Sequence, residues 1–276
     1  MLDSGMNMRR FLPPATLVML VLAACSNATP SGTSSATSSA PTPPASASAS
    51  ASASATPFPA AYEKGAAYAP TIDPANFVEA VDNPYFPLVP GTRWVMQAHG
   101  GSAGEMTITL VTHQTKTIMG IKCTVVRDEV DLNGELKELT HDWYAQDSEG
   151  NVWYMGEETA EYRNGHVSTR EGSWEAGVGG AVPGIIMPGS PIVDLTYRQE
   201  FLKGSAEDLA KVVDLSAKAD TPFDTFTDVR VTEDWTPLEP NIVERKYYAR
   251  GVGLVMEQLV QGGNGTNKLT EYRSAS

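Results

Sequence analysis

The sequence has little cysteine, little histidine and no long apolar run. Its 276 residues include two cysteines, Cys25 and Cys123, and four histidines, so no disulfide framework is predicted. The apolar stretch near the start, residues 11–22, contains two prolines, whereas a membrane-spanning helix needs about 20 apolar residues. We therefore expect neither a disulfide-stabilised scaffold nor a transmembrane helix.

Signature motifs of the common enzyme classes are also missing. The chain has no G-x-S-x-G nucleophile turn, no H-E-x-x-H zinc motif and no Gly-Lys-Ser/Thr phosphate loop. We predict no catalytic residue, no metal and no cofactor. A non-enzymatic role is favoured over an enzyme.

Basic residues are scarce relative to acidic ones. The chain has 20 Lys and Arg residues against 33 Asp and Glu residues. Without residues 1–24, which hold two arginines and one aspartate, the net charge is −14. Such a surface repels nucleic acid and anionic lipid headgroups. We expect no nucleic-acid partner, and membrane contact only through an attached lipid.

The N-terminus has the three parts of an export signal. Arg9 and Arg10 precede the apolar stretch, which ends in Leu-Ala-Ala before Cys25. Small residues before a cysteine resemble the lipobox of bacterial lipoproteins. The resemblance implies cleavage before Cys25, acylation of that residue, and anchoring on the extracytoplasmic face of the cell membrane. The alternative is an ordinary secretory signal in which the cysteine is incidental.

A low-complexity segment follows the cysteine. Between residues 26 and 57, 30 of 32 residues are Ser, Ala, Thr or Pro. Such a composition cannot offset the entropy of ordering, so a disordered tether is predicted. The predicted organisation is a signal peptide at 1–24, the lipidated cysteine with its tether at 25–60, and a single β-rich domain at 61–276.

The domain shows the alternation and turn signals of β-strands. Asn-Gly pairs at 133–134 and 164–165 favour two-residue hairpins. We predict a mainly β fold, a large antiparallel curled sheet or half-barrel of about ten strands, with at most one or two short helices. The one helix expected is at 205–211, where Ser205 and Asp208 have capping-box spacing. Cys123 alternates with apolar neighbours, so a buried structural thiol is predicted.

Residues 176–193 contain no charge and five glycines. An uncharged segment of this length predicts a long apolar loop: a plug that seals one mouth of the curled sheet, a lid over a ligand groove, or a patch that meets a partner. The ligand or lid candidates are the aromatic and apolar residues Trp143, Trp153, Trp174, Ile185, Ile186 and Met187.

Three acidic clusters are candidate sites. His141 and Asp142 are adjacent, so they point to opposite faces of a strand, and ordinary surface is the favoured interpretation. The acidic residues from Asp147 to position 158 resemble a calcium loop in spacing, but a hairpin turn is favoured. A further cluster, Glu200 with Glu207 and Asp208, could serve glycoside hydrolysis, but solvated surface is favoured.

Several stretches resemble a group of uncharacterised secreted bacterial lipoproteins. They are NPYFPLVPGTRW at 83–94, DWYAQDSEGNVWYMGE at 142–157 and GSWEAG at 172–177. The closing stretches TPF at 221–223 and YYARGVGLV at 247–255 are similar to strands of LolA/LolB-like lipoproteins. The resemblance implies a curved antiparallel sheet and no established activity.

Three functions remain open. The favoured one is a membrane-anchored, non-enzymatic binding module for a hydrophobic or small ligand held by the curled sheet. The second is a cell-envelope scaffold that binds a partner protein. The third is a hydrolase that acts on envelope carbohydrate.

Overall fold

The computed structural model describes residues 58–275. The export signal, Cys25 and nearly all of the tether lie outside the described residues. Within 58–275 the chain forms an antiparallel sheet of 16 strands, and helical structure is limited to two 3₁₀ turns of three residues, at Pro74–Asn76 and Gly100–Ser102. The predicted mainly β fold is confirmed, with more strands than the ten expected.

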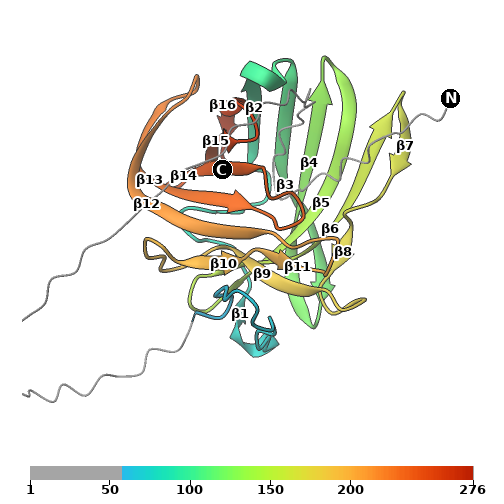
Figure 1. Cartoon of the computed structure of the whole chain (residues 1–276), viewed down its shortest axis with the longest axis vertical. Coiled ribbons are helices and arrows are strands. Elements are labelled where there is room, and N and C mark those ends of the chain that lie inside the picture. Colours follow the sequence, from blue (N-terminus) through green and yellow to red (C-terminus); the bar gives the residue numbers. More distant parts are fainter. Residues whose placement is uncertain (1–57, 276) are drawn as a thin grey trace, which may run out of the picture.

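The long strands supply most of the wall, and the short ones lie near its ends (Figure 1). The strands are β1 (Phe77–Val78), β2 (Arg93–His99), β3 (Glu105–Ile118), β4 (Ile121–Leu132), β5 (Glu135–Asp147), β6 (Val152–Arg163), β7 (His166–Thr169), β8 (Trp174–Glu175), β9 (Val182–Met187), β10 (Thr196–Arg198), β11 (Glu200–Phe201), β12 (Leu209–Asp220), β13 (Thr225–Trp235), β14 (Val243–Ala249), β15 (Gly253–Gln261) and β16 (Thr266–Arg273).

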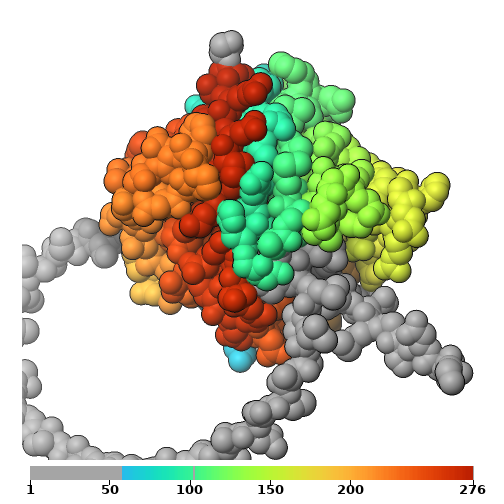
Figure 2. Space-filling view, turned by 90° about the horizontal axis from the view of Figure 1, so that it is seen from above, coloured from blue at the N-terminus to red at the C-terminus, as the bar shows by residue number. Residues whose placement is uncertain are grey.

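The sheet curls until its two ends nearly meet. The strand order is β10-β12-β13-β14-β15-β16-β2-β3-β4-β5-β6-β9-β11. Consequently β16, near the C-terminus, pairs with β2, and Figure 2 shows them side by side in red and teal. The end strands β10 and β11 are separated by a single residue. The sheet is therefore almost a closed barrel.

The turns follow from residue type. Asn133 and Gly134 both have positive φ, 54° and 81°, as do Asn164 and Gly165 at 54° and 74°. Two successive positive φ angles define the type I′ turn, whose twist matches that of paired strands. The two Asn-Gly hairpins predicted from the sequence are confirmed.

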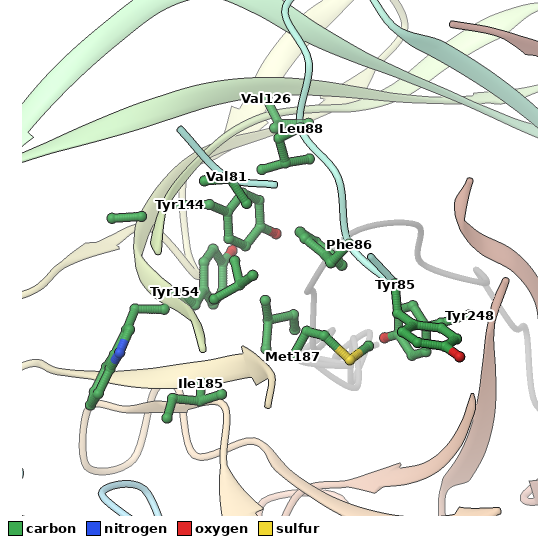
Figure 3. Close-up of a cluster of buried hydrophobic side chains, with 14 of the residues drawn as sticks. Val81, Tyr85, Phe86, Leu88, Val126, Tyr144, Tyr154, Ile185, Met187 and Tyr248 are labelled. Carbon is green, nitrogen blue, oxygen red and sulfur yellow. The ribbon is translucent and has the colours of Figure 1, made fainter. Parts of the chain in front are cut away.

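One part of the interior is filled by a segment that crosses between the walls. This plug segment, residues 81–88, buries Val81, Tyr85, Phe86 and Leu88 among side chains of the surrounding strands (Figure 3). The ring of Phe86 lies 5.2 Å from that of Tyr144, centroid to centroid. The interior is sealed here by the chain's own aromatic residues.

The plug segment is locked in place by the two motifs noted in the sequence. Asn83 Nδ2 donates to the carbonyl of Gly150 at 2.8 Å, and the backbone N–H of Tyr85 donates to Asn83 Oδ1 at 2.9 Å. The N–H groups of Asp82 and Asn83 donate to Gln146 Oε1. The stretches at 83–94 and 142–157 therefore contact each other, and the residues that make these contacts have a structural role.

The uncharged segment 176–193 is not simply a loop, because its centre is strand β9. β9 pairs with β6 and with β11 and is buried along most of its length. A Cβ added at Gly184 would overlap the backbone of Arg198 and Gln199. Buried backbone on both sides explains why this stretch carries no charge and needs glycine.

The predicted helix at 205–211 is wrong. Ala206 forms a β-bridge with Leu202, and Leu209 begins β12, which pairs with β13. Pairing along the whole of β13 outweighs the local capping signal. Within the described residues no helix is long and apolar enough to cross a membrane.

Candidate binding site in the barrel interior

The inner face of the wall is identified on β5. Tyr144 is fully buried in the core, and residues two apart share a face of a strand. Glu138, Thr140 and Asp142 therefore also point inward, and all three are buried. The alternation that normally separates a core from solvent here places two carboxyl groups inside the sheet.

Cross-strand pairing carries this polar layer to the neighbouring strands. Asp142 lies opposite Glu157 of β6, and Thr140 lies opposite Asp128 of β4. On the other side of the barrel, Lys246 of β14 lies opposite Glu257 of β15. Directly paired residues share a face, so these side chains all face the interior.

Nine buried carboxyl groups make up this layer, here called the acidic ring. Each is at most 8% exposed. Lys246, which is 2% exposed, is the one lysine buried with them among the described residues. The members are Glu105, Asp128, Glu138, Asp142, Glu157, Glu200, Asp208, Asp234 and Glu257.

Neighbouring side chains satisfy only part of the ring. Tyr154 Oη donates to Asp142 Oδ1 at 2.7 Å, and Thr109 Oγ1 donates to Asp128 Oδ2 at 2.9 Å. The Lys246 ammonium lies 3.5 Å from Asp234 Oδ2. Each contact reaches one oxygen of a carboxyl group.

Nine buried carboxyl and amide oxygens in and beside the ring have no hydrogen-bond partner among the described residues, and the hydroxyls of Tyr144, Tyr197 and Thr232 lack one as well. Seven belong to carboxyl groups and two to the amides of Gln199 and Asn267. A buried acceptor without a donor costs about 1–3 kcal/mol. The carboxyl oxygens are those of Asp128, Asp142, Glu157, Glu200, Asp208, Asp234 and Glu257.

Burial and mutual repulsion raise the pKa values in the ring. Burial raises the pKa of Asp142 and that of Asp208 to about 7. Burial, followed by the charge of Glu200, raises the pKa of Glu157 well above its usual range. For Lys246, burial acts to lower the pKa, but the surrounding carboxylates outweigh it and the pKa is raised. Near neutral pH the ring therefore holds protons that isolated carboxyl groups would have lost.

Within the described residues, no three His, Cys, Asp or Glu side chains gather in a way that could hold a metal ion. In the turn that resembles a calcium loop, the chain's own donors occupy the Asp147 carboxylate. It accepts hydrogen bonds from the backbone N–H groups of Glu149 and Asn151, and from the side chains of Asn151 and Trp153. The hairpin interpretation fits this arrangement.

The predicted ligand or lid residues are all buried but do not form one group. Trp174 lies opposite Glu157 and 5.2 Å from the Tyr154 ring, so it borders the acidic ring. Trp143, adjacent to Asp142, faces the other way, and its ring lies 3.2 Å from the Lys116 ammonium. Trp153 donates to Asp147. Ile185, Ile186 and Met187 belong to β9 and pack in the core.

Two surface predictions are wrong. Asp142 is 1% exposed, and of the cluster expected on the surface at 200–208, Glu200 and Asp208 are buried. His141 and Asp142 point to opposite faces, as expected, but the face of Asp142 is the inner one. A carboxyl group usually lies on the solvent side of a strand. Applying this rule placed Asp142, Glu200 and Asp208 on the surface, where they are not. Cys123 is buried and free, as predicted, and burial raises the pKa of its thiol to about 12.

Comparison with known proteins identifies no family. No family model matches the chain, and no curated protein matches it in sequence. Among solved structures, a candidate exported protein with a YmcC-like fold from Bacteroides fragilis is 16% identical with a TM-score of 0.41, over 69% of this chain and 99% of that one. A candidate lipoprotein from Parabacteroides distasonis is 12% identical with a TM-score of 0.39, over 71% of this chain and 100% of that one. The likeness to LolA/LolB lipoproteins stays a prediction.

Proposed function

We propose that this chain is an exported lipoprotein, anchored through Cys25, whose barrel binds a small polar ligand without transforming it. The supporting observation is the set of nine buried oxygen acceptors that lack a donor among the described residues. Native proteins pair nearly all buried polar atoms, and those left unpaired need an explanation such as an unseen molecule. A ligand with several donors would pair them.

The apolar part of the interior offers little space to a ligand. A cavity of about 40 Å³ lies between the plug segment and the wall, bordered by Phe86, Leu88, Trp94 and Met96. A space of that size holds a few water molecules. Of the two ligand types expected from the sequence, hydrophobic or small, the small polar one is therefore favoured.

Native mass spectrometry of the full chain, purified gently from the cells that produce it, tests the binding role. We expect a mass above that of the polypeptide with its lipid, and the excess should disappear on denaturation and be recovered as a small molecule. Asp142→Asn should reduce the bound fraction, whereas the exposed-site control Glu271→Gln should not. A protein that carries nothing, and from which nothing is extracted, would contradict the proposal.

The anchor is tested separately with Cys25→Ser. We expect the wild-type protein in the membrane fraction, labelled by radioactive palmitate, and the variant released and unlabelled. Membrane retention of the unlabelled variant would mean that another part of the chain holds it there.

Partner binding is a second candidate, favoured by exposed apolar side chains at the ends of the segment 176–193. Val178, Ile192 and Val193 are 59%, 66% and 49% exposed. Photo-crosslinking in cells from position 192, with position 63 on the exposed N-terminal part of the domain as the control, should capture one defined protein if this role holds. Equal, diffuse labelling from both positions would exclude it.

A further inference from the structure

The two unpaired amide oxygens show what kind of group is missing. Asn267 Nδ2 donates to Glu257 Oε2 and to Thr107 Oγ1, both at 3.3 Å, and Gln199 Nε2 donates to Asp234 Oδ2 at 3.2 Å. These orientations place each amide nitrogen, not its oxygen, against an oxygen of the acidic ring. Both side chains are fully buried, and the oxygen of each lacks a donor.

An amide oxygen is only an acceptor, and neither of these two oxygens has a donor among the described residues. A carboxyl group that keeps its proton can donate to a neighbouring carboxylate, so the seven unpaired carboxyl oxygens alone would be ambiguous. Unpaired donors are fewer: they are the hydroxyls of Tyr144, Tyr197 and Thr232, the Trp174 indole N–H and one Arg198 N–H. The interior therefore has more unpaired acceptors than unpaired donors.

Charge balance points the same way. The ring has nine carboxyl groups and one buried ammonium, Lys246. Arg198 is also buried, but it is adjacent to the inward-facing Tyr197, and its guanidinium stacks on Phe201 with the carbon 4.4 Å from the ring centroid, outside the barrel interior. A bound molecule that donates hydrogen bonds and carries positive charge would pair the free acceptors and balance the negative charge of the carboxylates.

The carboxyl groups are spread around the wall, not gathered at one point. Asp128 and Asp142 lie on β4 and β5, Glu157 on β6, Asp234 on β13 and Glu257 on β15. One ammonium group has three donors and could meet only one part of this circle. Several amines joined by a flexible apolar chain could meet several parts at once.

Aromatic rings border the circle and suit the apolar links of such a molecule. Tyr144 and Tyr154 stack with ring centroids 5.0 Å apart, and Trp174 meets Tyr154 edge to face. Aromatic faces attract ammonium groups and pack against methylenes. Solvent reaches the ring most at Asp208 and Asp234, which are 6% and 8% exposed, so we place the entrance on the β12–β13 side.

We propose that the acidic ring binds an aliphatic oligoamine, with its ammonium groups on the carboxylates and amide oxygens and its methylenes against the tyrosines. This inference rests on the proposed binding function and names its ligand class. Because the carboxyl groups hold protons near neutral pH, binding of the cation should displace protons into solution. Raising the pH from about 5 to about 8 removes the protons of Asp142 and Asp208, whose pKa values are about 7, while alkyl ammonium groups keep theirs, so affinity should rise.

Isothermal titration of the purified full chain with spermidine tests the proposal. We expect saturable binding, with a heat that changes with the ionisation enthalpy of the buffer because protons are released. Asp142→Asn and Glu257→Gln should each weaken binding by about tenfold or more, the size expected for a charged hydrogen bond. The control Glu271→Gln, whose side chain is 55% exposed, should bind like the wild type.

The outcomes separate this inference from a general effect of negative charge. Loss of binding in a ring variant counts only if its melting temperature is at or above the wild-type value, as expected when a repelled charge is removed. Equal binding by ring and control variants would place spermidine on the surface and overturn the inference. Binding of Mg²⁺ alone with the same proton release would assign the ring to inorganic cations instead.

Failure of this inference is distinguishable from failure of the proposed function. A neutral or anionic small molecule recovered in the mass-spectrometric experiment would overturn the oligoamine and leave the binding role intact. A protein that carries nothing from cells and gives no heat with spermidine would overturn both.

Discussion

Asp142 illustrates how far the sequence determines a site at the scale of one residue. The alternation in β5 correctly placed Asp142 and Tyr144 on one face, but it did not say which face is inner. The choice is made by β6 and β4, where Glu157 and Val126 lie opposite Asp142. A carboxyl group buried at the cost of a raised pKa runs against the general preference of acids for solvent, so composition alone pointed the wrong way.

Substitution Asp142→Asn should stabilise the protein at alkaline pH. The folded-state pKa of Asp142 is about 7, so above this pH the buried charge of the ionised carboxylate destabilises the folded state. Asparagine carries no charge and still offers an acceptor to the Tyr154 hydroxyl. We expect the free energy of unfolding to increase by about 1–3 kcal/mol near pH 8 and to change little near pH 5. Urea unfolding at the two pH values measures it, and a loss of stability at pH 8 would show that the charge is supported by the fold.

At the scale of elements, the long hairpins could be predicted and the closure of the sheet could not. Asn-Gly turns and alternation locate β4, β5 and their neighbours because these signals are local. β9 and the plug segment 81–88 carry no such signal, since their conformation is set by partners far along the chain, such as Gln146 for Asn83. The two motifs at 83–94 and 142–157 were visible in the sequence, but not their contact.

Substitution Asn83→Ala should loosen the plug segment. The substitution removes the hydrogen bond to the Gly150 carbonyl and the acceptor for the Tyr85 N–H. Asn83 is only 2% exposed, so water cannot replace these partners. We expect a loss of about 1–3 kcal/mol in the free energy of unfolding, because buried backbone groups lose their partners. Chemical denaturation measures the loss, and Asn76→Ala at an exposed turn is the control. An unchanged midpoint would contradict the locking role.

Substitution Gly184→Ala should disturb the junction of β9 with the strand end at 198–199. The added methyl group would overlap backbone atoms, which cannot move aside as a side chain can. We expect a destabilisation of about 1–3 kcal/mol or more. Gly180→Ala is the comparison, because that site has open space and only the positive φ of 90° to strain it. Thermal melting should rank the first variant below the second.

At the scale of the whole molecule, the acidic ring should reverse the usual effect of pH on an acidic protein. Its carboxyl groups have raised folded-state pKa values, so between about pH 4 and pH 7 the folded chain binds more protons than the unfolded one and stability falls as pH rises. We expect the melting temperature to be higher near pH 5 than near pH 8. Differential scanning calorimetry across this range measures it, and a maximum at pH 8 would show that the ring is ionised at little cost.

The pairing of β16 with β2 has a consequence for when the protein can fold. Residues 93–99 lie near the start of the domain, and their partner, 266–273, ends three residues before the C-terminus. A chain made from its N-terminus therefore keeps one edge of β2 unpaired until residues 266–273 are available to pair with it. The barrel wall closes only when nearly the whole domain has been synthesised, so the last strand, not the first, sets the moment at which the fold is complete.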